Sequence, residues 1–218
     1  MSNSTRFRLW LIGLVLCSAA VVVSIAYIDR PVADFVHANL HGTRAFFWFA
    51  RVLDPLVAAL VLGLLFLLVT GCWLLAGRRL GSWTQTPLLC CWSLVWALSS
   101  VVVSKRIFGR GSAYPDYVRD HIYGFHWFQG THGHDAFPSG TTTIAAAILI
   151  VLWIRIPRLR ALWAVVLGLI AAGLVVTNSH FVADVIGGAF LGASIGWMTV
   201  LLLQEAMSSK SNNMPSGP

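Results

Sequence analysis

The chain of 218 residues is 57% hydrophobic and only 11% charged, with a formal net charge of +7. A soluble domain usually carries about 25% charged residues, so this composition excludes an ordinary soluble protein and favours a single membrane domain. The basic residues are scattered between apolar runs instead of forming one patch, so the positive charge indicates membrane topology and not nucleic acid binding.

Six apolar runs are long enough to span or nearly span a bilayer, which takes about 20 helical residues. They cover residues 9–28, 55–76, 87–104, 139–154, 160–177 and 181–204. They predict an all-α bundle of six transmembrane helices in one membrane domain, residues 1–206, followed by a disordered polar tail, residues 207–218. The first run exceeds the apolar core of a signal peptide, about 7–15 residues, and is interpreted as an uncleaved anchor.

The short loops predict the orientation, because the positive-inside tendency is strongest there. Three short basic segments fall on one side, and they contain Arg6 and Arg8, Arg78 and Arg79, and Arg155, Arg158 and Arg160. This side is predicted to be cytoplasmic, so both termini lie inside the cell. Every aspartate and histidine then falls on the outer side. Titratable chemistry is thus expected at the periplasmic or extracellular face of a multi-pass protein of the cell (inner) membrane.

The segment SKRIFGR directly follows the third apolar run and contains Lys105, Arg106 and Arg110. Any one of these cations could simply complement the negative end of the helix dipole. On the outer side, however, three cations run against the usual sign bias. They can instead neutralise the oxygens of a phosphoryl group, with arginine making paired hydrogen bonds. The aromatic-rich loop that follows indicates an interfacial belt and, in addition, a lid or a surface where a lipid chain approaches.

Pro138, Ser139 and Gly140 open the fourth apolar run. Proline is favoured at the start of a helix, and the free N–H groups, the serine hydroxyl and the helix dipole together favour an anion. Glycine lets such a ligand approach the backbone closely. The tripeptide alone is a weak signal, since it recurs at residues 215–217. Its value comes from its place at the outer mouth of a helix.

His180 and Asp184 are four residues apart at the outer end of the last run, so they share a helix face. That face continues as a stripe of small residues, which allows close helix approach in lipid and predicts that it points into the bundle. The stripe consists of Gly188, Gly192 and Gly196. Two interpretations stay open: a structural His–Asp cap, or a carboxylate that fixes the tautomer of a nucleophilic or basic imidazole.

A lysine with a downstream arginine, then PSG opening a helix, then His-x-x-x-Asp on the last of six helices resembles the type-2 phosphatidic acid phosphatase family, kin to the vanadium haloperoxidases. The resemblance covers roughly residues 55–204. It implies a metal-independent phosphatase without a cofactor, acting on lipid phosphates or polyprenyl diphosphates from the outer leaflet. By the resemblance, His180 attacks phosphorus to give a phosphohistidine that water hydrolyses, and Asp184 orients it. The phosphoryl oxygens would be held by Lys105, Arg110, Ser139 and the Gly140 backbone.

Three departures from the family pattern affect this expectation. The Arg-Pro of the first motif is Ser112-Ala113 here, the histidine of the second motif is Thr141, and the arginine six residues before the nucleophile is Leu174. Arg110, two residues earlier than the family position, is the candidate replacement for the first arginine. The sequence offers no replacement for the family arginine whose position is taken by Leu174.

Thr141 cannot donate a proton as an imidazolium does, and losing a positioned general acid typically costs about 10²–10⁴ in rate. A loop histidine, His132 or His134, is one substitute. Alternatively, the leaving group needs no proton, as when a diphosphate bond breaks. Any surviving activity is expected to favour diphosphates over simple monoesters. The remaining alternative is a catalytically impaired relative that binds phosphorylated lipids without turning them over.

Two other protein classes fit the sequence less well. A membrane metal oxidase would need several histidine ligands to converge, but the candidates are irregularly spaced. These are His37, His41, His132 and His134. The four cysteines all lie in apolar runs without metal-binding spacing. A transporter is disfavoured because the chain shows no internal repeat and no matched pair of Gly/Pro-broken helices.

Overall fold

A computed structural model of the protein describes residues 3–44, 46, 63, 66, 69–70, 73, 85–129 and 134–212, with side chains up to residue 202. The described residues are helical and contain no β-strand beyond one isolated bridge between Arg110 and Phe125. The all-α prediction is therefore confirmed. Four of the helices are long and apolar enough to cross a membrane, so the predicted number of six is not confirmed.

The N-terminal segment is one continuous helix from Ser4 to Leu40. It consists of α1 (Asn3–Val23), a π-helical turn (Ser24–Ile28) and α2 (Asp29–Leu40). The helix therefore extends well beyond residue 28, where the predicted first span ends. Pro31 does not break it, because it lies in the first turn after the π-helical segment, where its missing N–H is tolerated. Gly42, with a φ of 78°, follows the last turn and ends the helix.

Four α-helices described from residue 85 onward follow the predicted apolar runs closely. They are α4 (Gln85–Phe108), α5 (Gly140–Arg155), α6 (Arg160–Val176) and α7 (Val182–Asn212). The predicted span at residues 55–76 lies almost wholly outside the described residues. The tail predicted to be disordered from residue 207 differs in part, because α7 stays helical to Asn212. This stretch contains no glycine or proline before Pro215, and several of its residues favour a helix.

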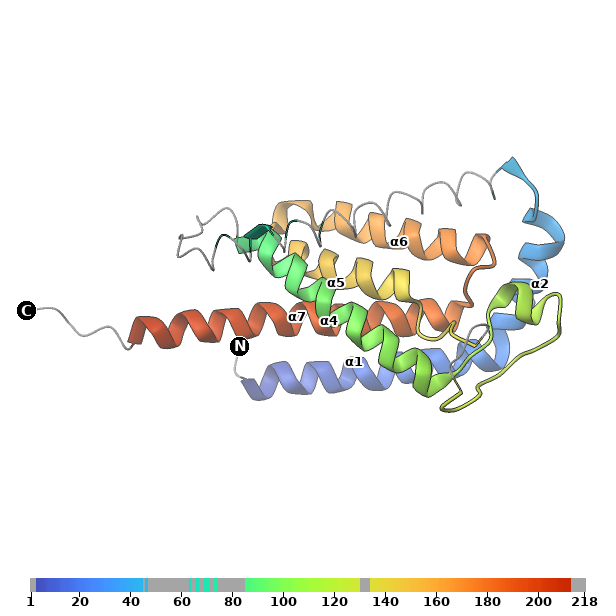
Figure 1. Cartoon of the computed structure of the whole chain (residues 1–218), viewed down its shortest axis with the longest axis horizontal. Coiled ribbons are helices and arrows are strands. Elements are labelled where there is room, and N and C mark those ends of the chain that lie inside the picture. The colour runs from blue at the N-terminus through green and yellow to red at the C-terminus, as the bar shows by residue number, and fades with distance from the viewer. Residues whose placement is uncertain are drawn as a thin grey trace, which may run out of the picture.

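Helix α5 lies in the middle of the bundle and packs most extensively against α7 (Figure 1). The glycine stripe on α7 makes this contact possible, as the sequence predicts. A Cβ atom on Gly188 would lie 2.6 Å from the carbonyl oxygen of Ser139, and one on Gly192 would overlap the carbonyl oxygen of Thr143. The face of α7 that begins with Asp184 therefore points into the bundle and is held against the start of α5.

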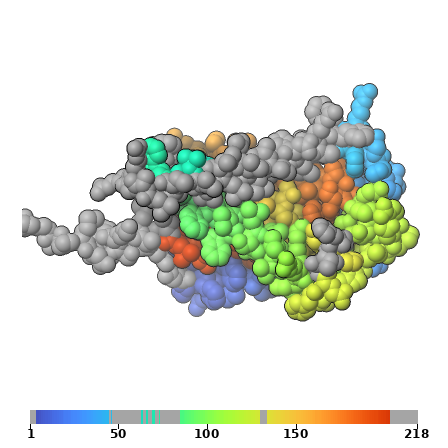
Figure 2. Space-filling view, in the orientation of Figure 1, coloured from blue at the N-terminus to red at the C-terminus, as the bar shows by residue number. Residues whose placement is uncertain are grey.

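The two ends of the bundle differ in the elements that they carry. The start of α1 and the end of α7 lie at one end, whereas α2 and the segments 109–129 and 134–139 lie at the other, beside the start of α7 (Figure 1). The space-filling view shows α2 and the segment 109–129 in contact at that end (Figure 2). The three segments singled out in the sequence therefore meet at the end of the bundle opposite the start of α1 and the end of α7.

Candidate active site

Asp184 is the residue on which the three motifs converge. It lies in the first turn of α7, and its side chain is fully buried. Its Oδ1 accepts a hydrogen bond from Arg110 Nη1 at 2.5 Å, and its Oδ2 accepts one from the backbone N–H of Phe181 at 3.0 Å. Its carbonyl oxygen accepts a hydrogen bond from the backbone N–H of Ser139 at 3.0 Å. One residue thus joins the loop after α4, the start of α5 and the start of α7.

His180 lies in the turn between α6 and α7, where its backbone N–H donates to the carbonyl oxygen of Leu174 at 3.2 Å. Its side chain is 14% exposed, and Nδ1 lies 3.7 Å from Asp184 Oδ2. This separation exceeds a hydrogen bond, and Nδ1 has no partner among the described residues. Catalytic hydrogen bonds are often long without substrate, so this separation is compatible with a His–Asp pair.

The start of α5 forms a helix N-terminus inside the protein. Ser139 is its N-cap, fully buried, and its Oγ accepts hydrogen bonds from Thr142 N at 3.4 Å and from Thr142 Oγ1 at 3.0 Å. The backbone N–H groups of Gly140 and Thr141 make no hydrogen bond to any described residue. Such free amides, at the positive end of a helix dipole, favour an anion.

Lys105 brings a positive charge to this helix start. It lies in the last turn of α4, and its Nζ would be 3.9 Å from a Cβ atom placed on Gly140. The same Nζ lies 3.7 Å from Asp135 Oδ2, in a partly exposed ion pair. A substrate phosphoryl group could compete for the ammonium here, because Asp135 is largely exposed. The ammonium and the amides of α5 thus come together as the sequence predicts.

Arg110 has different partners from those predicted. Its side chain is fully buried; Nη1 donates to Asp184, and Nη2 donates to Asp29 Oδ2 at 2.6 Å and to the hydroxyl of Tyr123 at 3.2 Å. Burial acts to lower the pKa of Arg110, but the charges of Asp184 and Asp29 outweigh it and the pKa is raised. The ring of Phe181 packs against the guanidinium, with its centroid 4.6 Å from the guanidinium carbon. The guanidinium is therefore committed to two carboxylates in this structure.

Comparisons with known proteins agree with this arrangement. The model of the PAP2 superfamily matches residues 86–208, which is more than half of the chain. The chain belongs to the PAP2 superfamily. Its fold is similar to that of a transmembrane PAP2-type phosphatidylglycerolphosphate phosphatase from Bacillus subtilis, with a TM-score of 0.57 and 18% sequence identity over 91% of this chain and 96% of that chain. No curated protein sequence matches the chain.

Two of the positions that depart from the expected family pattern, Ala113 and Leu174, are buried. The backbone N–H of Ser112 donates to Asp116 Oδ2 at 2.6 Å, and Ala113 is buried in a cluster with Phe181. Leu174 is buried in an apolar cluster between α5, α6 and α7. A charged side chain at position 174 would therefore meet an apolar environment.

The described contacts do not place His132 or His134, the candidate substitutes for the general acid, at the candidate active site. His132 lies outside the described residues. The ring of His134 packs against the ring of His126, with centroids 4.5 Å apart, and its Nδ1 has no hydrogen-bond partner among the described residues. Within that part of the chain, no three His, Cys, Asp or Glu side chains form a group that could hold a metal ion.

Two hydrogen-bond partners of Arg110, Asp29 and Tyr123, were not predicted from the sequence. Asp29 accepts hydrogen bonds from Arg110 and from the backbone N–H of Ala183, and Tyr123 donates to the carbonyl oxygen of Ile25 at 2.9 Å. A carboxylate beside an apolar membrane helix is itself a signal for a functional residue. Its partner could not be identified, because 81 residues separate it from Arg110.

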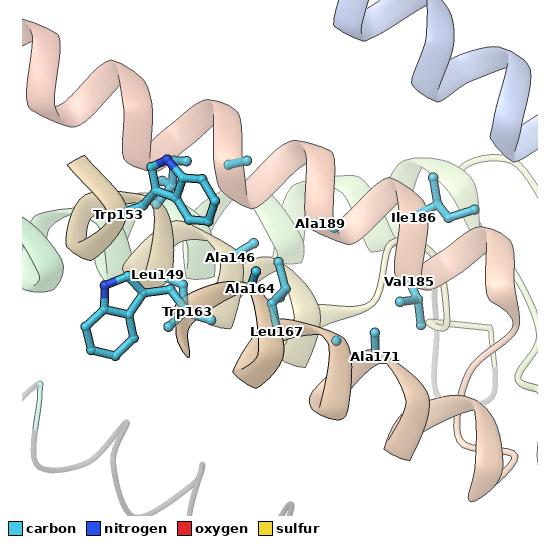
Figure 3. Close-up of a pocket in the computed structure, with 13 residues that line it drawn as sticks. Ala146, Leu149, Trp153, Trp163, Ala164, Leu167, Ala171, Val185, Ile186 and Ala189 are labelled. Atoms are coloured by element: carbon cyan, nitrogen blue, oxygen red, sulfur yellow. The ribbon is translucent and has the colours of Figure 1, made fainter. Parts of the chain in front are cut away.

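An apolar cavity lies apart from this site, between α5, α6 and α7, with a volume of about 530 Å³ (Figure 3). Trp153 and Trp163 lie toward one end of it, and Val185 and Ile186 toward the other (Figure 3). No polar residue of the three motifs lines this cavity. His180 and Asp29 instead line a narrow cleft together with Asn178, whose Nδ2 donates to the carbonyl oxygen of Ala33 at 3.1 Å.

Proposed function

We propose that this PAP2 superfamily protein is an integral membrane phosphatase that hydrolyses a lipid phosphate or polyprenyl diphosphate through a phosphohistidine. The observation that supports it best is the convergence on Asp184 of the Arg110 side chain, the Ser139 backbone and the adjacent His180. The convergence lies opposite the start of α1 and the end of α7 (Figure 1), so with both of these ends in the cytoplasm the proposed reaction takes place at the outer face. Neither a metal nor another cofactor takes part in the proposed reaction.

The proposed reaction has two displacement steps at phosphorus. Asp184 faces Nδ1 of His180, so Nε2 is the nitrogen left to attack. A phosphorus–nitrogen bond forms, and the bond from phosphorus to the leaving oxygen breaks, so the electron pair leaves with that oxygen. In a monoester this is the oxygen of the lipid alcohol, whereas in a diphosphate it is the bridging oxygen, which leaves with the lipid monophosphate. Water then attacks phosphorus, the phosphorus–nitrogen bond breaks, and inorganic phosphate is released. Lys105 and the first amides of α5 stabilise the negative charge that develops on the phosphoryl oxygens.

The leaving group determines which substrates this site can process. Thr141 offers no acidic proton, so a leaving alkoxide from a monoester would depart unprotonated. A diphosphate instead releases a phosphate that is already stable as an anion. We therefore expect faster turnover of a polyprenyl diphosphate than of phosphatidic acid by the protein in detergent. Faster hydrolysis of phosphatidic acid would contradict this substrate preference.

Substitution of the nucleophile tests the enzymatic function. His180→Ala is expected to abolish phosphate release, since no phosphorus–nitrogen bond can form. Wild-type protein, incubated with a substrate ³²P-labelled at the transferred phosphoryl group and quenched in alkaline detergent, is expected to retain label in a base-stable, acid-labile form that His180→Ala lacks. Equal phosphate release by wild type and His180→Ala would contradict the mechanism.

A second candidate function is binding of phosphorylated lipids without turnover. Two observations favour it: Arg110 is already bonded to two carboxylates, and the apolar Leu174 stands where the family has an arginine. Among the described motif residues, Lys105 is then the cation beside the start of α5. In that case wild-type protein would bind a lipid phosphate in vesicles but release no phosphate. Lys105→Ala would weaken the binding.

A further inference from the structure

Asp29 reaches this site from a helix that lies outside the matched PAP2 region, residues 86–208. Its side chain is fully buried, at the junction of the π-helical turn and α2. Oδ1 accepts a hydrogen bond from the backbone N–H of Ala183 at 3.0 Å, and Oδ2 accepts one from Arg110 Nη2 at 2.6 Å. A buried carboxylate is costly unless it is paired in this way.

We propose that Asp29 is a positioning residue, which orients Asp184 and thereby His180 by fixing the guanidinium of Arg110. The inference rests on the proposed phosphatase function. Asp29 and Asp184 hold the two ends of the Arg110 fork, one on Nη2 and the other on Nη1. With Arg110 held at both ends, Oδ1 of Asp184 has a fixed partner, and its Oδ2 is directed toward His180 Nδ1.

Asp29 also contacts the start of α7, which directly follows the turn that carries the proposed nucleophile. Its Oδ1 binds an N–H of the first turn of α7, between Phe181 and Asp184. It therefore constrains both the side chain and the backbone that set the position of His180. A misplacement of about 1 Å in a catalytic group can cost roughly 10²-fold in rate, so this constraint bears on turnover.

Arg110 has more carboxylate partners than its charge requires. Asp29 and Asp184 together carry two negative charges against the single positive charge of Arg110. Charge compensation alone would require only one of them. The second carboxylate is therefore not needed to neutralise the arginine, and its geometry gives it the task of holding Nη2. A purely structural role would leave the rate constant of the folded enzyme unchanged when Asp29 is neutralised.

Asp29→Asn isolates this role. The amide oxygen can still accept from Ala183, and Arg110 keeps a one-to-one ion pair with Asp184, so no charge is stranded. The matched control is Asp34→Asn, which makes the same change on α2, where the exposed Asp34 carboxylate accepts from the hydroxyl of Tyr117 at 3.1 Å.

The full-length variants are compared in detergent with a polyprenyl diphosphate, and kcat is normalised to monodisperse protein. Asp29→Asn is expected to lower kcat and kcat/KM together by about 10- to 100-fold, with KM unchanged within about twofold. Asp34→Asn is expected to leave both constants unchanged. Unchanged kcat in folded Asp29→Asn, or an equal loss in Asp34→Asn, would overturn the proposal. If wild type itself shows no turnover, the proposed function fails and this inference with it.

Two further variants separate a direct effect from one that passes through Arg110. Arg110→Lys removes the two guanidinium nitrogens that Asp29 and Asp184 hold. In that background Asp29→Asn is expected to cause no further loss of kcat. If Asp29→Asn lowered kcat there by the same factor as in wild type, its effect would not pass through Arg110 and the proposal would be overturned. Asp29→Glu keeps the charge but displaces the carboxylate by one methylene, and decides the question if Asp29→Asn does not fold. Folded Asp29→Glu with reduced kcat supports a positioning role, whereas full kcat would refute it.

Discussion

Removal of the Arg110 guanidinium tests the buried network most directly. Arg110→Met keeps most of the side-chain volume but leaves Asp29 and Asp184, both fully buried, without a counter-charge. Breaking a buried ion pair from one side typically costs about 3–5 kcal/mol of stability. For a protein of this size, each 1 kcal/mol lowers Tm by roughly 2–4 °C, so we expect a fall of roughly 6–20 °C.

The assay is thermal unfolding of purified protein in detergent, followed by fluorescence or by loss of the monodisperse peak. A double variant, Arg110→Met with Asp29→Asn, removes one of the two stranded charges and is expected to recover part of the lost Tm. Arg119→Met is the matched control, because Arg119 pairs with Asp120 on the exposed loop; its Tm is expected to match that of wild type. If Arg110→Met unfolded at the wild-type temperature, or Asp29→Asn gave no recovery, the network would not be the stabilising element inferred here.

Three further substitutions test other parts of the structure. Thr141→His is expected to raise hydrolysis of phosphatidic acid, by at most the roughly 10²–10⁴-fold typical of a general acid; no gain in a folded variant would mean that another group already donates the proton. Gly192→Ala would bring a methyl group onto the carbonyl oxygen of Thr143 and should lower Tm by several degrees, whereas Gly168→Ala, with open space around it, should not; equal Tm values for the two variants would contradict the close α5–α7 contact. Leu174→Arg would restore the family arginine but bury a charge in an apolar cluster, so we expect loss of folded protein in size-exclusion chromatography and no gain of activity.

The helices from α4 onward could be predicted from the sequence because each is an uninterrupted apolar run with a clear boundary. The PSG motif marks the start of α5, although Ser139 is the N-cap and Pro138 precedes it instead of occupying the first helical position. The glycines of α7 face α5 as their spacing predicts. The extension of the first helix through α2 could not be predicted in the same way. Its residues are polar on one side, and hydropathy alone ends the span where the apolar run ends.

The composition of the candidate site was predictable, but the pairing within it was not. Short motifs identified Lys105, His180 and Asp184 through local spacing. The sequence marked Arg110 as a phosphate ligand because its charge and its place after α4 suit that role. Its actual partners depend on how α2 packs against the loop, and such a contact between distant segments leaves no periodic trace in the sequence.

The length of the N-terminal helix has a consequence for where the substrate meets the protein. A hydrocarbon layer about 30 Å thick takes about 20 helical residues, so the 21 residues of α1 are enough to cross it. With α1 crossing the layer, the π-helical turn and α2 would extend beyond the acyl chains, and Asp29 with its partners would lie level with the lipid headgroups. Under the proposed function, a phosphorylated lipid would then be hydrolysed at the depth of its own phosphate, with its tail still in the leaflet.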